Sequence, residues 1–137
     1  RGGWILGVMF IDLDKFKLIN DTHGHDVGDR VLQGVAQRLN EQVRSGDTIC
    51  RYGGDEFLYL LVNPQSTANI EGVARKVLDS ISQSLIIDDL MLTIKPSIGI
   101  AVYPSDGNTG QELVANADAA MYRAKEKKAG CVFFDER

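Results

Sequence analysis

The sequence predicts an α+β domain in which helices pack around a largely antiparallel sheet. Strand-like and helix-like segments follow one another in the order β-α-α-β-β-α-β-β-α-β. Two hairpins lie within this order, and a hairpin forces its two strands to pair in antiparallel fashion. The arrangement β-α-β-β-α-β is embedded in the same order, which favours a ferredoxin-like core.

Length and composition limit the class of protein. The chain has 137 residues, of which 44% are hydrophobic and 25% are charged, as is typical of one globular domain with a substantial core. Its net charge of −4 provides no broad basic surface, so we expect no DNA or RNA partner. A nucleotide would need a local site or a metal ion to hold its phosphates.

The chain shows no sign of an exported or membrane-spanning segment. Its longest apolar run, Trp4–Ile11, is too short to cross a bilayer, and no signal peptide is apparent. Cys50 and Cys131 are too few for a disulfide scaffold and are typical of reduced thiols. We therefore expect a cytoplasmic single domain over residues 1–137. The abrupt ends of the chain indicate a piece of a larger multidomain protein, which could be membrane-anchored through other segments.

The first predicted element is a strand at Trp4–Ile11, because a continuous apolar run of this length is typical of a strand buried on both faces. Asp12 and Asp14 follow it. Carboxylates at the end of a central strand are well placed to bind a metal, although Asp14 could instead cap the next helix. Residues Lys15–Asn20 predict a short helix whose first-turn amides could meet phosphate oxygens, and Thr22–Gly28 predicts a polar loop.

Three longer helices are predicted from apolar residues at helical spacing. The first begins at Asp29 and ends near Arg44-Ser45-Gly46, the second covers Ile70–Ile81, and the third covers Leu113–Ala124.

A hairpin is predicted from the strands Thr48–Tyr52 and Phe57–Val62, which are joined through Gly53 and Gly54. We expect positive φ angles at this glycine pair, because glycine enters such turn conformations without steric cost.

The remaining strands lie in the second half of the chain. Leu85–Ile87 and Met91–Ile94 flank two aspartates and predict a second hairpin. Apolar residues from Ile94 to Val102 alternate with smaller ones, which is typical of a half-buried strand. Cys131–Phe134 predicts the last strand.

Asp55 and Glu56 stand side by side at the tip of the first hairpin. Adjacent carboxylates repel each other unless water or a cation compensates them. An isolated tip of this kind is usually only a solvated turn. If the first strand pairs beside this hairpin, however, Asp12 and Asp55 converge on one point, and such oxygen ligands suit Mg²⁺.

Several motifs follow one another in a recognisable order. They are Asp12–Asp21, Gly24–Asp29, Arg51–Phe57, Ser97–Ala101 and Ala117–Lys125. Together they resemble the GGDEF family of diguanylate cyclases over nearly the whole chain. The resemblance implies a nucleotide-cyclase-like core and an enzyme that joins two GTP into cyclic di-GMP and two pyrophosphates. It also implies Mg²⁺, with Mn²⁺ as an alternative ion, and a homodimer in which each domain holds one GTP.

The resemblance also assigns the reaction centre. It implies Asp12, Asp55, Glu56 and the carbonyl of Leu13 as metal ligands. Asp55 takes the position of the catalytic base. Glu56 would bind the metal directly or contact one of its ligands. Lys17 resembles the lysine that stabilises charge on the transferring phosphate.

In such an enzyme, Asn20 and Asp29 would recognise guanine, Asn20 by donating from its side-chain amide. A carboxylate can accept from the N1–H and the exocyclic amine of guanine, whereas adenine has no such donor pair. Asp29 could also cap the long helix. Leu32 would pack against the base or belong to the core, and His25 would contact the nucleotide or be an ordinary neutral loop histidine.

Phe16 and Lys125 complete the substrate-binding residues that the resemblance implies, Lys125 as a phosphate ligand. After Lys125 the chain departs from the family pattern of Gly-Arg-Asn and continues as Glu126–Cys131. The second basic phosphate contact is therefore missing or moved to Lys127 or Lys128.

Arg44 and Asp47 match an RxxD inhibitory site for the product, and Arg75 falls where a further arginine often joins in. The usual meaning of such a pair is a surface salt bridge. The closing Phe133–Asp135 resembles a junction with an EAL phosphodiesterase domain, so an attached sensor or EAL domain is expected. Two alternatives to an active cyclase stay open: a silent GTP or cyclic di-GMP sensor that regulates an attached domain, and a structural dimerisation domain.

Overall fold

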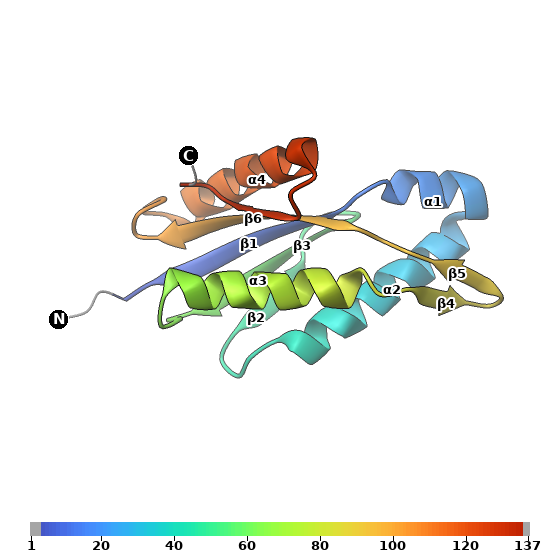
Figure 1. The fold of residues 1–137 in the computed structure, drawn as a ribbon, viewed down its shortest axis with the longest axis horizontal. Coiled ribbons are helices and arrows are strands. Elements are labelled where there is room, and N and C mark those ends of the chain that lie inside the picture. The colour runs from blue at the N-terminus through green and yellow to red at the C-terminus, as the bar shows by residue number, and fades with distance from the viewer. Residues whose placement is uncertain (1–3, 136–137) are drawn as a thin grey trace.

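The central strand of the protein is the first one in the chain. The computed structural model describes residues 4–135 and contains a five-stranded sheet in the order β2-β3-β1-β6-β7 (Figure 1). The strands are β1 (Leu6–Leu13), β2 (Thr48–Arg51), β3 (Glu56–Val62), β4 (Leu85–Ile87), β5 (Leu90–Leu92), β6 (Pro96–Tyr103) and β7 (Cys131–Phe133). The helices are α1 (Phe16–His23), α2 (His25–Gln42), α3 (Thr67–Ile81) and α4 (Gly110–Lys127). The predicted α+β class is confirmed.

Both neighbours of β1, β3 and β6, pair with it in antiparallel register, and only β6 and β7 are parallel. The predicted strand at Trp4–Ile11 begins and ends two residues too early, because β1 begins at Leu6 and continues through Asp12 and Leu13. Its burial on both faces is confirmed. Met9 and Ile11 pack into the core under α2 and α3, whereas Val8 and Phe10 pack under α4.

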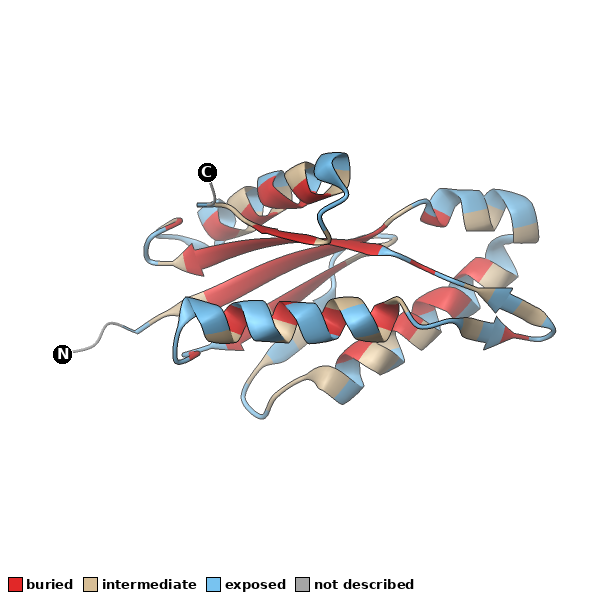
Figure 2. Ribbon diagram, viewed as in Figure 1, coloured by how far each residue is buried: buried red, intermediate tan, exposed pale blue. Residues whose placement is uncertain are grey.

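The sheet is thus sandwiched between two helical layers. Figure 2 shows buried strands between helices whose outward faces are exposed. Larger apolar side chains form the core on the α2 and α3 side, including Val35, Ile70 and Val77. The α4 side is thinner and contains Ala117 and Met121. No helix within residues 4–135 is long and apolar enough to cross a membrane.

Strand β6 differs from the prediction in two ways. The predicted order merged it with the second strand of the β4–β5 hairpin, but β5 ends at Leu92 and forms a separate two-stranded sheet with β4. The strand is also buried on both faces rather than half-buried. The reason is Gly99, where an added Cβ would lie 2.0 Å from the carbonyl oxygen of Ala117. Helix α4 therefore lies directly on the strand backbone.

The predicted loop at Thr22–Gly28 is wrong. Helix α1 runs to His23 and α2 begins at His25, so only Gly24, with φ of 92°, separates them. Asp29 consequently lies inside α2 and is not its N-cap. Asp14 does not cap α1 either, because the N-cap is Lys15, with φ of 59° and no side-chain cap hydrogen bond.

The β2–β3 hairpin is confirmed, but its turn differs from the prediction. Among the described residues, the glycines with positive φ are Gly24, Gly46, Gly107 and Gly130, and Gly53 and Gly54 are not among them. An added Cβ at Gly53 would lie 2.6 Å from Glu56 Oε1, the end of a flexible side chain that can move away.

The contact at Gly99 gives a stability prediction. We expect Gly99→Ala to lower the free energy of unfolding by about 3 kcal/mol, because the methyl group must displace the α4 backbone. Gly72→Ala is the matched control, since no atom lies within 4 Å of its added Cβ and alanine favours the interior of α3. Urea unfolding of both variants measures the difference. Equal stabilities would show that α4 does not lie tightly on β6.

Candidate functional site

The end of β1 and the tip of the β2–β3 hairpin meet at one point. Asp12 pairs in register with Glu56, and the Leu13 N–H donates to the carbonyl of Asp55 at 3.1 Å. Carboxylate oxygens of Asp12, Asp55 and Glu56 all lie within 4.8 Å of one another. The condition set by the sequence, that the first strand pairs beside the hairpin, is therefore met.

The three carboxylates are partly withdrawn from water. Asp12 is 7% exposed. Burial raises the pKa of Asp55 above its usual value, and the charge of Asp12 adds to this effect. Burial also raises the pKa of Glu56, with further contributions from Asp12, Asp55 and Asp118 on α4. Crowded acids of this kind repel one another, and their oxygen atoms would fit a hard divalent ion such as Mg²⁺.

Lys125 brings a positive charge to this cluster from α4. Its ammonium group forms an ion pair with Asp12 Oδ2 and lies 3.9 Å from Asp14 Oδ1. Burial acts to lower the pKa of Lys125, but the hydrogen bond and charge of Asp12 outweigh it and raise that pKa. Asp14 is held in turn by Ser97, whose hydroxyl lies 2.9 and 3.0 Å from its two carboxylate oxygens.

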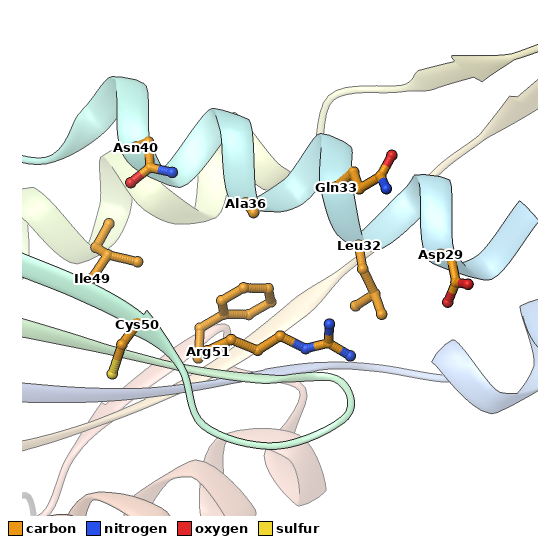
Figure 3. A pocket seen from close by; sticks show the side chains of 9 residues that line it. Asp29, Leu32, Gln33, Ala36, Asn40, Ile49, Cys50 and Arg51 are labelled. Carbon is orange, nitrogen blue, oxygen red and sulfur yellow. The ribbon is translucent and has the colours of Figure 1, made fainter.

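A cavity of about 400 Å³ lies between α2 and the β2–β3 hairpin. It is lined by Asp29, Leu32, Gln33, Ala36, Asn40, Ile49, Cys50, Arg51 and Phe57 (Figure 3). Two residues assigned to the substrate by the sequence, Asp29 and Leu32, are in this lining. Leu32 is 6% exposed and belongs to the core, and its packing against a base stays a prediction.

The other predicted substrate residues surround the junction of α1 and α2. Asn20 and Phe16 pack against Gly28, where an added Cβ would lie 1.8 Å from Asn20 Oδ1 and 3.3 Å from the Phe16 ring. Phe16 is buried. His25 is exposed as the first residue of α2 rather than in a loop, and Lys17 is exposed on α1. Their roles stay predictions.

Arg51 is the site residue that sequence reasoning missed. Its Nε donates to the carbonyl of Gly53 at 3.0 Å and its Nη2 to the carbonyl of Gly54 at 2.7 Å. Its side chain also lines the cavity and extends toward the end that contains Asp29 and Leu32 (Figure 3). Arg51 thus connects the cavity to the loop that presents Asp55. An arginine two residues before a glycine pair was the available signal, but its meaning depends on the turn geometry.

Arg44 and Asp47 form an ion pair, but it is not a surface salt bridge because the side chain of Asp47 is buried. Arg44 Nε donates to Asp47 Oδ2 at 2.7 Å, and the Asp47 side chain is 1% exposed. The same carboxylate accepts from the Val62 N–H at 2.8 Å and from the Tyr59 hydroxyl at 3.3 Å. The pair therefore supports the end of β3. Arg75 is exposed on α3, and its Nη2 lies 3.4 Å from Glu71 Oε2. The role of Arg44, Asp47 and Arg75 in inhibition stays a prediction.

The basic residues that follow Lys125 lie at the end of α4. Lys127 is in its last turn, and Lys128 is the C-cap, with φ of 53°. Both are exposed. Neither forms an ion pair with the carboxylates among the contacts of the described residues, so a second phosphate contact from them stays a prediction.

Comparison with known proteins gives consistent matches. The family model of the diguanylate cyclase GGDEF domain matches residues 3–131. The bifunctional diguanylate cyclase/cyclic di-GMP phosphodiesterase MucR of Pseudomonas aeruginosa is 48% identical over 129 residues, which are 93% of this chain and 19% of MucR. The diguanylate cyclase TpbB of the same species is 40% identical over 91% of this chain and 29% of TpbB. The chain thus spans less than a third of either curated relative.

A solved structure shares the fold closely. The EAL/GGDEF domain protein from M. capsulatus superposes with a TM-score of 0.92 at 45% identity, covering 98% of this chain and 88% of that chain.

The role of Arg51 can be tested by hydrogen exchange. We expect Arg51→Met to accelerate exchange of the Tyr52 and Gly53 amides roughly tenfold, because both donate to Glu56 across the turn that the guanidinium fork closes. Arg123→Met is the matched control, since Arg123 donates to the carbonyls of Phe133 and Phe134 instead. Unchanged exchange in the hairpin would show that Arg51 does not hold the loop.

Proposed function

Because the chain belongs to the GGDEF family of diguanylate cyclases, we propose that it joins two GTP into cyclic di-GMP and releases two pyrophosphates. The observation that carries the proposal is the convergence of Asp12, Asp55 and Glu56 within 4.8 Å. Three carboxylates around one point, with a lysine beside them, suit a reaction whose participants are all anionic. The nearby cavity offers room for the base.

The metal site would be formed by the carboxylates of Asp12, Asp55 and Glu56, with the Leu13 carbonyl as a further oxygen ligand. A Mg²⁺ or Mn²⁺ ion held there would neutralise phosphate charge and polarise the α-phosphate. The donor set supports this assignment, because hard divalent cations prefer carboxylate and carbonyl oxygens.

Asp55 is the proposed general base. In each of the two condensations, a 3′-oxygen bonds to an α-phosphorus, the bond from that phosphorus to the pyrophosphate oxygen breaks, and the hydroxyl proton leaves. Asp55 would accept that proton. Lys125 and Lys17 would steady the negative charge on the phosphates.

Asn20 and Asp29 are proposed to select guanine, with Leu32 and Phe16 packing nearby and His25 beside the nucleotide. The position of Asp29 supports this role, because Asp29 is exposed and lines the cavity. A carboxylate left without guanine donors opposite adenine would be desolvated and unpaired, which disfavours ATP.

Catalysis in this proposal requires a homodimer. Each chain has one cluster of three acids among its described residues, and the product contains two nucleotides. Two chains must therefore bring their clusters face to face. We also propose product inhibition at Arg44, Asp47 and Arg75, in which the arginines bind the product and Asp47 orients Arg44.

A second candidate is a silent sensor domain that binds GTP or cyclic di-GMP and regulates an attached EAL phosphodiesterase or other domain. The M. capsulatus relative is an EAL/GGDEF domain protein, which supports the attached EAL domain that this alternative requires. In either case the proposal places the domain in the cytoplasm, with a sensor or EAL domain attached.

Product formation tests the main proposal. We expect cyclic di-GMP from GTP and Mg²⁺, identified by mass spectrometry, with a rate that rises more steeply than linearly with protein concentration. Asp55→Asn should lower the rate roughly 100-fold or more through loss of the base. Asp79→Asn, which removes an exposed charge from α3, should not. A folded sample that binds GTP but forms no product would favour the sensor.

Guanine selection gives a separate prediction. We expect Asp29→Ser to lower the preference for GTP over ATP by roughly tenfold or more, because adenine no longer leaves a carboxylate unpaired. Competition binding of the two nucleotides measures this preference. Asp26→Ser is the control, since Asp26 lies in the first turn of the same helix and does not line the cavity. Strict GTP selectivity in Asp29→Ser would contradict the assignment.

A further inference from the structure

Asp12 lies on the same side of β1 as α4, and Asp14 follows it in the turn just after the strand ends. Side chains two residues apart point to the same face of a strand, and Val8 and Phe10 pack under α4. Lys125 approaches this face from the last turn of α4, with 39% of its side chain exposed. Its ammonium group therefore lies between two acids that differ in burial, because the Asp12 side chain is 9% exposed and that of Asp14 is 29% exposed.

The ion pair with Asp12 compensates a buried charge. A carboxylate withdrawn from water and surrounded by Asp55 and Glu56 is costly without a positive partner. Among the ion pairs of residues 4–135, that of Lys125 supplies this partner. The lysine thus provides the positive charge that a metal ion would otherwise bring.

A divalent ion and the ammonium group compete for this position. An ion bound by the three carboxylates would lie about 2.0–2.6 Å from their oxygens. Lys125 contacts one of the oxygens of Asp12, so the two positive charges would be only a few ångströms apart. Their repulsion in a partly buried site is strong. Binding of the ion is therefore favoured when the ammonium group moves away from Asp12.

Asp14 is placed to receive the displaced group. Its carboxylate is 3.9 Å from Lys125 Nζ and is fixed by the hydroxyl of Ser97, a residue that is 2% exposed. Ser97 is itself the register partner of Asp12 on β6. The second acid is therefore held rigidly beside the first, within a small movement of the lysine side chain.

We propose that Lys125 is an internal counter-ion of the metal site, which a divalent cation displaces from Asp12, and that Asp14 is a positioning residue that retains the displaced ammonium group at the site. The lysine then faces the phosphates of the nucleotide that accompanies the metal. This inference rests on the metal site of the proposed function and adds a competition and a second anchor to it.

The competition is tested by Mn²⁺ binding without nucleotide, with free Mn²⁺ measured by electron paramagnetic resonance. We expect Lys125→Met to tighten Mn²⁺ binding on the order of tenfold, because a competing charge at contact distance is removed. Lys125→Arg should stay within a few-fold of the unchanged protein because it retains that charge. Lys127→Met is the matched control, an exposed lysine of the same helix, and should change affinity by about twofold or less.

The retention is tested with Asp14→Asn and a GTP analogue that has a methylene bridge between its α and β phosphates. We expect Asp14→Asn to weaken binding of the analogue several-fold in saturating Mn²⁺, because the displaced ammonium group is no longer held. Ser97→Ala should act in the same direction, since it releases Asp14. Circular dichroism establishes that each variant is folded.

The outcomes separate the inference from the proposed function. If the unchanged protein and Asp12→Asn both fail to bind Mn²⁺, the metal site itself is wrong, and both proposals fall. If Asp12→Asn abolishes binding but Lys125→Met does not tighten it, the counter-ion role is wrong while the metal site stands. An Asp14→Asn variant that binds the analogue normally would overturn the positioning role.

Discussion

The antiparallel pairing of β1 with β3 is the constraint on which the candidate site depends. It places Asp12 opposite Glu56 and brings the backbone of Asp55 to Leu13. A slip of one residue would turn Asp12 to the other face of the sheet, away from Lys125. Burial of β1 on both faces opposes such a slip, because it would also exchange the residues that enter the two unequal cores. The packing of ordinary apolar residues therefore sets the geometry of the acids.

The second requirement is the close approach of α4 to the sheet. Gly99 leaves no side chain between β6 and the α4 backbone, so the helix lies low enough for Lys125 to reach Asp12. On the opposite face, Arg51 joins the hairpin loop to the cavity beside α2. Each helical layer thus contributes a different part of the site. Helix α4 provides the positive charge of Lys125, and α2 provides part of the cavity lining.

The sequence was sufficient for the fold class and the central buried strand, because these follow from apolar runs, turn spacing and motif order. It predicted the convergence of the acids only on the condition that the first strand pairs beside the hairpin, which the structure shows. It was insufficient where a local pattern depends on its neighbours. The polar residues from Thr22 to Gly28 resemble a loop, yet they lie in two helices because Gly24 alone makes the turn. Alternation in β6 indicated one exposed face, yet α4 covers it. Ser97 acts through Asp14, which only the folded chain brings near, and the contacts of Arg51 with Gly53 and Gly54 depend on the geometry of the turn.

The position of the site across the end of the sheet affects how the domain unfolds. Asp29 and Leu32 belong to the α2 layer, whereas Lys125 belongs to the α4 layer, and the sheet separates their apolar cores. A ligand that touches both ends of this arrangement acts as a cross-link between layers that otherwise share only the strands. Its binding then raises the free energy of opening either layer, since neither layer can open without releasing it.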